Sequence, residues 1–420
     1  MAISRRVFVK SGGLALVSLG LDPLFLARAA YATPRDGGAE RPLLVCIFQR
    51  GAVDGLSVVI PHGDAAYYSE RPRIAVRSSD LVDLDGHFGL HPALAPLKPL
   101  WDNKSLALVP AVGSPDATRS HFDAQDYMES GTPGVKVTSD GWLNRYCQHC
   151  REHETTPFRA AAFGAELPRI LAGSAPALAI PDLQAFGRTG GGGRRDGRTD
   201  TITRAFEEMY AGSSTGLISS SAQEAFEAVR MLREANPTQY TPDNGAAYPQ
   251  GRFGHTMLQL AQLIKANVGL EIAFADVSGW DTHVNQGAAE GQLANRLREF
   301  GAGLAAFAQD MGERMRHIVV LTMSEFGRTV RENGSGGTDH GHGTAMLVMG
   351  GPVSGGRIAG RWPGLDSGVR YEGRDVPVTT DFRDLFSEIL VRHCGAPDVQ
   401  PVFPGFTGDR TRFPGVIRAV

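Results

Sequence analysis

The chain has 420 residues, of which 42% are hydrophobic and 21% are charged. This composition suits one large or two ordinary globular domains with an ample core, and it excludes a chain that is disordered as a whole. A formal net charge of -3 excludes the basic balance that wrapping nucleic acid requires, so no nucleic-acid partner is expected. The 52 glycines and 25 prolines follow no period, which excludes repeat and collagen-like architectures and indicates many loops between short elements.

The first 32 residues are typical of a twin-arginine (Tat) export signal. Residues 4–10 read SRRVFVK, a moderately apolar segment follows at 14–26, and Ala-Tyr-Ala at 30–32 offers small residues for cleavage before Thr33. A membrane anchor is the alternative, but glycines, an aspartate and a proline interrupt a run shorter than the ~20 apolar residues that span a bilayer. The sequence therefore predicts a periplasmic or secreted protein that meets the Tat translocase during export and keeps no stable membrane span after cleavage.

The export signal also bears on charge and chemistry. It holds four cations and one anion, so its removal takes the net charge from -3 to about -6. Twin-arginine export carries folded proteins, commonly because a metal or cofactor is inserted first, and this favours a metalloprotein. Cys147 and Cys150 form a C-x-x-C, for which a small disulfide, a redox pair and half of a zinc site all remain open.

Apolar runs of strand length recur along the rest of the chain, and they are continuous rather than alternating. Continuous apolarity is typical of strands buried on both faces, as in a mostly parallel sheet. Helical patterns lie between them at 253–267, 291–316 and 379–395, the last with Thr380 as cap and Gly395 as stop. The runs are 43–49, 105–113, 177–182, 270–279, 317–327 and 345–351. This alternation predicts an α/β sandwich.

Two stretches look like surface excursions from a single domain at 33–420. Residues 186–200 are rich in glycine and arginine but lack the residue order of a phosphate-cradling loop, and residues 234–252 carry three prolines. Neither stretch marks a firm domain boundary.

Polar side chains follow four of the predicted strands. In open α/β sheets, ligands bind beyond the carboxyl ends of the strands, so placement there is informative. Carboxylates and imidazoles together favour Zn, Mn or Fe over Ca. The segments that follow the strands are 50–55, 114–131, 280–283 and 324–342.

Two pairs in these segments have the spacing of metal ligands. Asp281 and His283, like His340 and His342, are two residues apart, which points both side chains of a pair to one side of an extended segment. Two such pairs can clamp two cations about 3.5–4 Å apart. Each motif alone also fits a turn or a cap, and Asp54 alone fits a turn residue.

Ser120 is the candidate nucleophile. It lies where a helix should begin, with Asp123 three residues on, so an ordinary N-cap is the alternative. Both roles are compatible, because a helix N-terminus also holds a transferred anion. A nearby dication would lower the pKa of the hydroxyl and activate it.

Several of these motifs resemble one known family. The twin-arginine start is combined with G-x-x-D-G-L at 51–56, SHF at 120–122, GWDTH at 279–283, SEFGRT at 324–329 and DHGHGTAMLVMGG at 339–351. The set resembles the bacterial domain-of-unknown-function family numbered fifteen-oh-one, which is grouped with the alkaline-phosphatase-like superfamily.

The resemblance implies a three-layer α/β/α sandwich with a mostly parallel central sheet and two metals at the strand ends. By the same resemblance, Asp54 is the early aspartate ligand, Ser120 the nucleophile, Asp281 and His283 the middle pair, and His342 the late histidine. The middle pair is shorter here than the superfamily's usual Asp-x-x-x-His. Glu325-Phe326 replaces the superfamily's usual Asp-His. Either Asp339 and His340 restore that pair from the turn, or the second metal is lost.

The sequence thus predicts an exported metal-dependent hydrolase of phosphate esters, with sulfate esters as the second choice. Attack would come from Ser120 or metal-bound hydroxide, one or two divalent ions (Zn, Mn or Fe) would be held, and the substrate would be a small-molecule or envelope-polymer ester. A formylglycine sulfatase is not expected, because residues 114–124 lack the C/S-x-P-x-R order. The alternatives are a non-catalytic metal-binding cell-envelope protein and a zinc amidase or peptidase. The predicted metal ligands are Asp54, Asp281, His283, Glu325, Asp339, His340 and His342, and the predicted substrate-binding residues are Arg50, His121 and Arg328.

Overall fold

The computed structural model describes residues 15–17, 41–150, 158–183 and 240–418. Most of the predicted export signal, the stretch at 186–200 and the first part of 234–252 lie outside the described residues. Within the described part, no helix combines the length and apolarity needed to cross a membrane.

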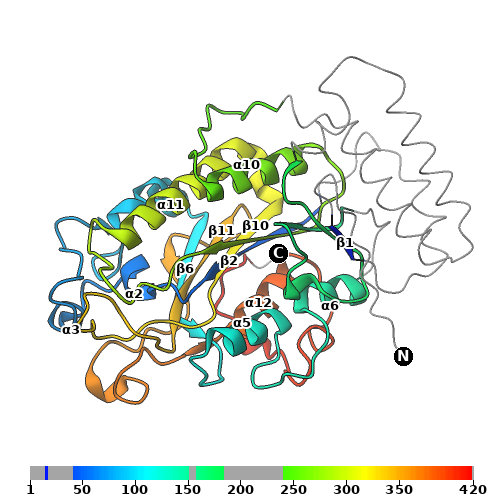
Figure 1. The fold of residues 1–420 in the computed structure, drawn as a ribbon. Coiled ribbons are helices and arrows are strands. Elements are labelled where there is room, and N and C mark those ends of the chain that lie inside the picture. Colours follow the sequence, from blue (N-terminus) through cyan, green and yellow to red (C-terminus); the bar gives the residue numbers. More distant parts are fainter. Residues whose placement is uncertain (1–14, 18–40, 151–157, 184–239, 419–420) are drawn as a thin grey trace, which may run out of the picture.

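A ten-stranded sheet runs through the centre of the molecule (Figure 1). In spatial order its strands are β1 (Ala15–Val17), β8 (Ala177–Ala179), β7 (Ala160–Phe163), β9 (Ile272–Ser278), β2 (Leu43–Arg50), β10 (Ile318–Met323), β11 (Thr344–Gly350), β6 (Leu106–Gly113) and β12 (Arg357–Ile358), with β13 (Thr380–Asp381) also paired to β6. A separate small sheet contains β3 (Val59–Ile60), β5 (Gly89–Leu90) and β4 (Val82–Asp83).

The large sheet is mostly parallel, as predicted. Strands β8, β7, β9, β2 and β10 are successively parallel, whereas β11 is antiparallel to both β10 and β6. Strand β6 therefore runs in the same direction as β10. Strand β1, from within the predicted export signal, is an antiparallel edge strand on β8.

Helices cover both faces of the sheet and give three layers (Figure 1). Along β2, Leu43, Val45 and Ile47 belong to the core shared with helices α10 (Arg252–Lys265) and α11 (Gln292–Met311). The alternate residues Leu44 and Cys46 belong to the core shared with α6 (Trp142–His149) and α12 (Phe382–Arg392). Burying each large aliphatic side chain on both faces contributes about 1.5–3 kcal/mol, which explains the continuous apolarity of these strands.

The remaining helical segments are short, apart from α5 (His121–Ser130), which follows β6. They are α2 (Gly55–Val58), α3 (Ala65–Glu70), α4 (Lys98–Asp102), and the 3-10 turns η1 (Pro92–Leu97), η2 (Arg169–Leu171), η4 (Gly312–His317), η5 (Ser367–Val369) and η6 (Arg410–Arg412).

All six predicted strands and three predicted helices are present, with shifts at their ends. The helix expected over 291–316 ends at Met311, because Gly312 takes a φ of +50° and the chain continues as a 3-10 turn. The cap of α12 is Asp381, whose side chain accepts a hydrogen bond from the Arg383 N–H, while Thr380 belongs to β13. Strand β7 was not predicted from the sequence.

Candidate metal centre

The predicted site segments meet at one edge of the sheet. Strands β6, β9, β2 and β10 all run toward this edge, so the residues that follow them emerge side by side. Strand β11 is antiparallel, so the residues before it, 339–342, also lie at this edge. The topology therefore gathers segments that are more than 200 residues apart in the sequence, as expected for ligand sites in open α/β sheets.

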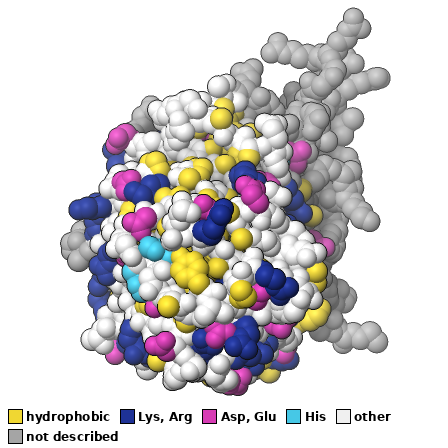
Figure 2. Space-filling view, turned by 90° about the vertical axis from the view of Figure 1, so that its left-hand side faces the viewer, with side chains coloured by type: hydrophobic (Ala, Val, Ile, Leu, Met, Phe, Trp, Pro, Cys, Tyr) yellow, Lys and Arg dark blue, Asp and Glu magenta, His cyan; other side chains and the backbone are white. Residues whose placement is uncertain are grey.

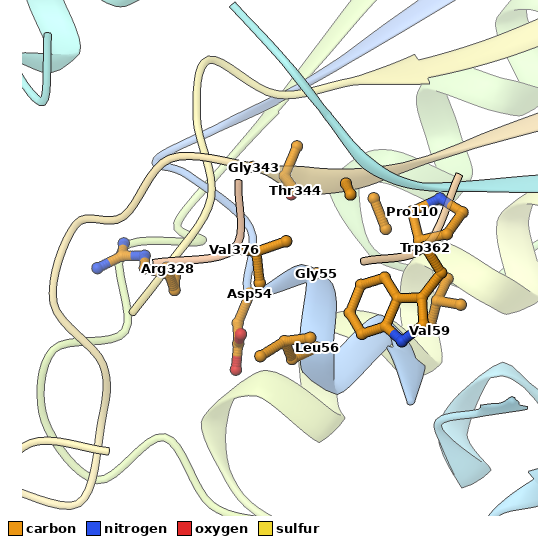
Figure 3. Close-up of a pocket in the computed structure, with 12 residues that line it drawn as sticks. Asp54, Gly55, Leu56, Val59, Pro110, Arg328, Gly343, Thr344, Trp362 and Val376 are labelled. Carbon is orange, nitrogen blue, oxygen red and sulfur yellow. The ribbon is translucent and has the colours of Figure 1, made fainter. Parts of the chain in front are cut away.

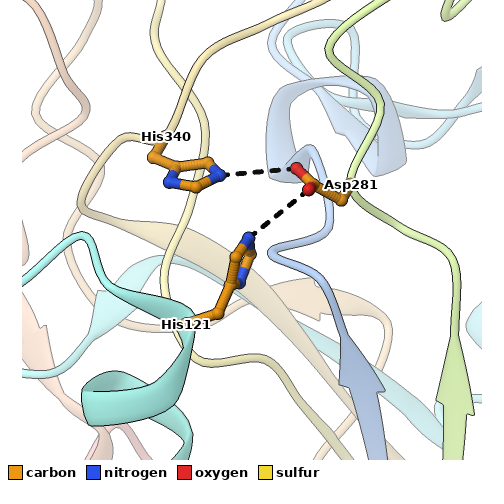
Figure 4. Close-up of side chains that lie close together, drawn as sticks. All are labelled: His121, Asp281 and His340. Atoms are coloured by element: carbon orange, nitrogen blue, oxygen red, sulfur yellow. Dashed lines mark ion pairs between the residues drawn. The ribbon is translucent and has the colours of Figure 1, made fainter.

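Four side chains form a cluster at this edge, here named the His–Asp cluster: His121, Asp281, His283 and His340. One ligand atom from each of His121, Asp281 and His340 lies within 4.8 Å of the others (Figure 4). The Nε2 atom of His121 is 3.6 Å from Asp281 Oδ2, and that of His340 is 3.4 Å from Asp281 Oδ1. The Nε2 atom of His283 is 2.9 Å from the same Oδ1. Three imidazoles thus aim one nitrogen each at one carboxylate.

Glu325 orients the His121 ring through its Nδ1 atom. Its buried carboxylate lies 2.8 Å from His121 Nδ1 and accepts hydrogen bonds from the Gln125 amide and the Gly51 N–H, each 2.8 Å long. Burial alone would raise the pKa of Glu325, but these hydrogen bonds outweigh it and hold the pKa below its usual range. The same contact raises the pKa of His121 against the effect of burial. The hydrogen on Nδ1 leaves Nε2 of His121 pointing into the cluster, where it is buried without a hydrogen-bond partner.

The other two imidazoles are oriented in the same way. Nδ1 of His340 lies 2.9 Å from the Arg119 carbonyl oxygen, and Nδ1 of His283 lies 3.2 Å from Asp339 Oδ1. Both acceptors favour a hydrogen on Nδ1, so both Nε2 atoms carry lone pairs. These two Nε2 atoms are only 3.0 Å apart, and the Nε2 atom of His283 also lies 3.4 Å from Nη1 of Arg328. Two lone pairs at 3.0 Å repel each other unless a cation or a proton lies between them. Burial lowers the pKa of His340, which favours its neutral ring.

Arg328 holds the Asp281 carboxylate in place. Its buried guanidinium donates to Asp281 Oδ1 at 2.5 Å and to the carbonyl oxygens of Gly51 and Ala52, each at 2.7 Å. Burial would raise the pKa of Asp281, but the hydrogen bond and charge of Arg328 lower it overall. Arg328 was predicted to bind substrate; the structure places it behind Asp281, where it joins the loops after β2, β9 and β10.

The turn after β2 requires a glycine at this point. Gly51 has a φ of +112°, and a Cβ there would lie 2.9 Å from the Asp281 nitrogen. The glycine lets the turn approach Asp281 closely enough to deliver its N–H to Glu325 and its carbonyl to Arg328.

Arg50, also predicted to bind substrate, is engaged in ion pairs. Its guanidinium donates to Asp276 Oδ2 at 2.6 Å and to Glu129 Oε1 at 2.8 Å, and it also contacts Gln125. These partners raise its pKa although burial opposes them. Arg50 therefore connects β2 to β9 and α5 and positions Gln125 beneath the cluster.

Asp54 lies apart from the His–Asp cluster, contrary to the expectation that it is a ligand. Its buried carboxylate receives two hydrogen bonds from Arg71, at 2.6 and 2.9 Å, and one each from Ser57 and Gln286. Burial would raise the pKa of Asp54, but Arg71 holds it low. Figure 3 shows Asp54 lining a pocket with Arg328, Thr344 and Trp362 among others. A cation could reach this carboxylate only by displacing its bidentate arginine.

His342, expected as the late histidine ligand, also lies outside the His–Asp cluster. The buried ring of His342 stacks on Tyr371, with centroids 4.4 Å apart, and burial lowers its pKa. The predicted pairing with His340 assumed that both side chains point to one side, but His340 faces Asp281 whereas His342 faces Tyr371. Gly341 between them packs closely on the Arg328 backbone, where a Cβ would lie 2.4 Å from it.

Ser120 is the exposed N-cap of α5, directly before His121. Its side chain makes no capping hydrogen bond, so the hydroxyl does not fill the N-cap role that was the alternative to a nucleophile. The sequence predicted His121 as a substrate-binding residue, and it did not predict Gln125 as part of the site. Their spacing of four residues on a predicted helix was the available signal, because residues i and i+4 share a face.

The donor set suits a transition metal. Three imidazole nitrogens and one carboxylate are the ligands that Zn, Mn and Fe accept, whereas Ca prefers oxygen alone. His121, Asp281, His283 and His340 would hold the ion, while Glu325 and Asp339 would orient two of the imidazoles from behind. The C-x-x-C motif contributes no ligand to this donor set. Burial raises the pKa of Cys147 to about 12, which disfavours the thiolate that a metal would bind.

Fold and site together define an α/β protein with a histidine and aspartate cluster at the carboxyl edge of its sheet. The chain belongs to the family described as "Protein of unknown function (DUF1501)", which matches residues 41–416. Two solved structures align with most of this chain at low sequence identity. A phosphonate monoester hydrolase of Agrobacterium radiobacter aligns over 84% of this chain and 74% of its own, with 10% identity and a TM-score of 0.31. The PsFucS1 sulfatase from Pseudoalteromonas sp. aligns over 98% of this chain and 79% of its own, with 13% identity and a TM-score of 0.36. No curated protein matches the sequence.

Proposed function

We propose that this protein is an exported metal-dependent hydrolase of phosphate esters, with sulfate esters as the second substrate class. The observation that carries the proposal is the convergence of three imidazole Nε2 atoms on the Asp281 carboxylate, with the Nε2 atom of His121 buried and without a hydrogen-bond partner. Export rests on the sequence signal, and a mature N-terminus near Thr33 in a soluble periplasmic fraction would support it.

The residues of this chain have separate tasks in the proposed reaction. The ion, when bound, supplies positive charge that stabilises the anionic ester oxygens and the attacking oxygen. Glu325 and Asp339 keep the imidazole hydrogens on Nδ1, so that the Nε2 atoms remain donors to the ion. Arg328 keeps Asp281 ionised and fixed. The exposed Ser120 hydroxyl is the proposed attacking group, with water as the alternative.

The first experiment is metal analysis of protein purified by its native export route, followed by a panel of chromogenic phosphomonoesters, phosphodiesters and sulfate esters. We expect a stoichiometric transition metal and turnover of at least one phosphate ester. Metal without turnover of any ester would favour the non-catalytic envelope protein.

Ser120→Ala tests the attacking group. We expect turnover to fall by several powers of ten, each being about 1.4 kcal/mol of barrier, with metal content unchanged. Stability should fall by no more than the low end of the ~0.5–2 kcal/mol that a lost cap costs, because the Ser120 side chain makes no capping hydrogen bond. Ser139→Ala, at another exposed serine before a helix, is the control and should leave turnover intact. Normal turnover in Ser120→Ala would assign the attack to water.

A further inference from the structure

Exposed apolar side chains occur in the segments that carry the His–Asp cluster. Among the residues that the structure describes, large hydrophobic side chains are exposed at five positions, and Phe122 at 91% is the most exposed of them. Phe122 directly follows His121, and Val284 directly follows His283. Two of the five thus adjoin histidines whose Nε2 atoms face Asp281.

Two more of the five adjoin the start of α5. Lys136 forms a 2.7 Å ion pair with Asp123, the residue after Phe122. The pair holds the segment that contains Val135 and Val137, the neighbours of Lys136, near the first turn of α5. Figure 2 shows a face of the molecule on which hydrophobic side chains lie next to histidines. Phe122, Val135, Val137 and Val284 are named the apolar rim below.

The exposure of Phe122 is not explained by packing. Helix α5 buries Ala124, Tyr127 and Met128 on its inner face, so the outward position 122 needs no apolar residue to hold the helix. The helix is anchored by the ion pairs Arg50–Glu129 and Arg169–Asp126, at 2.8 Å each. A phenyl ring displayed in water on a fixed element, beside a polar site, is typical of a binding surface.

We propose that the apolar rim binds the apolar part of the substrate, so that the substrate class is an ester of an anionic phosphoryl group with an aromatic or long-chain alcohol. This inference rests on the proposed hydrolase function. The cluster would hold the charged end, and Phe122, one peptide unit of about 3.8 Å from His121 between Cα atoms, would hold the leaving group.

The test measures the binding of phenylphosphonate and methylphosphonate to the metal-loaded full chain by calorimetry. The two anions share the charged group and differ in the apolar one. We expect phenylphosphonate to bind about tenfold more tightly, and the ratio of the two dissociation constants to fall toward one in Phe122→Ala. Val369→Ala, at an exposed valine that follows no cluster histidine, is the matched control and should keep the ratio.

The outcomes separate this inference from the proposed function. Equal affinities in the wild-type chain, or a ratio that Phe122→Ala leaves unchanged, would overturn the role of the rim while the hydrolase proposal stands. Binding of neither phosphonate, with no turnover of any ester, would overturn both. Equal affinities together with binding to phosphatidylcholine vesicles that Phe122→Ala abolishes would assign the rim to a membrane surface and overturn the inference.

Discussion

Glu325 shows how a buried carboxylate can serve a metal site without touching the metal. Its oxygen Oε1 receives hydrogen bonds from Gln125 and Gly51 and lies beside Nδ1 of His121, so the charge is fully engaged within the protein. A carboxylate in this position raises the basicity of the imidazole and fixes its ring. The residue type resembles a ligand in the sequence, and only the packing assigns it to the layer behind the ligands.

Glu325→Gln should therefore weaken metal binding without removing a ligand. The amide N–H of glutamine can donate a hydrogen bond to Nδ1 of His121. The imidazole hydrogen then lies on Nε2, which no longer has a lone pair to offer the metal. We expect a loss of about 10–100-fold in metal affinity, measured by competition with a chelator. Glu332→Gln, which alters another buried carboxylate on the same loop that pairs with Arg73, should lower stability but leave metal affinity unchanged. Equal losses in both variants would show a general effect of the loop.

Asp54 differs from Glu325 in its partner, because the carboxylate pairs with Arg71, whose side chain is itself completely buried. Breaking such a pair leaves an uncompensated buried charge, which costs about 3–5 kcal/mol. Asp54→Asn should lower the free energy of unfolding by that amount, measured by denaturant titration, and keep the metal affinity of the folded protein. Loss of metal with little change in stability would instead return Asp54 to the ligand set.

At the scale of elements, the sequence predicted most of what depends on local pattern. Continuous apolar runs predicted β2, β6 and β10 within a few residues, because burial on both faces leaves few polar positions in them. The polar residues after these strands were correctly expected at one edge. The partners of each ligand were not predictable, since they come from segments that only the sheet order brings together. His342 shows this, because its ring stacks on Tyr371, a partner that its spacing from His340 does not reveal.

Helix α12 carries a pH-sensitive carboxylate. Burial raises the pKa of Asp384 to about 6, its Oδ1 has no hydrogen-bond partner, and Arg412 contacts only Oδ2. Between pH ~4 and 6 the folded state keeps a proton that the unfolded state, with a pKa near ~3.9, has lost. Stability therefore decreases as the pH rises through this window and is not reduced further above it by this group.

Asp384→Asn should remove this pH dependence. We expect the stability of the variant relative to wild type to increase from pH 4 to 6 by about 1–3 kcal/mol, because the amide has no proton to lose. Denaturant midpoints of both proteins across this range would measure it. Parallel curves for the two proteins would show that Asp384 ionises alike in both states.

For the whole molecule, the cluster couples distant parts of the chain. Its side chains come from the loops after β6, β9 and β10, and Arg328 adds the loop after β2. An ion held by His121, Asp281, His283 and His340 would bind the folded state only, because the unfolded chain separates these residues by up to 219 positions. Metal occupancy should then appear as stability of the entire fold.

Removal of metal should lower the melting temperature of the wild-type chain, and re-addition of Zn or Mn should restore it. At a free ion concentration of about 100 times the dissociation constant, binding to the folded state alone stabilises by about 2.7 kcal/mol, which corresponds to a shift of about 3 °C for a chain of this length. His340→Ala removes one donor nitrogen and should abolish most of this shift. His255→Ala, at an exposed histidine outside the cluster, should keep it. A metal-dependent shift that survives in His340→Ala would place the ion elsewhere in the molecule. If the wild-type chain shows no shift with any transition metal, one of the paired imidazoles His283 and His340 must instead carry a proton, and their 3.0 Å contact would be a hydrogen bond rather than half of a metal site.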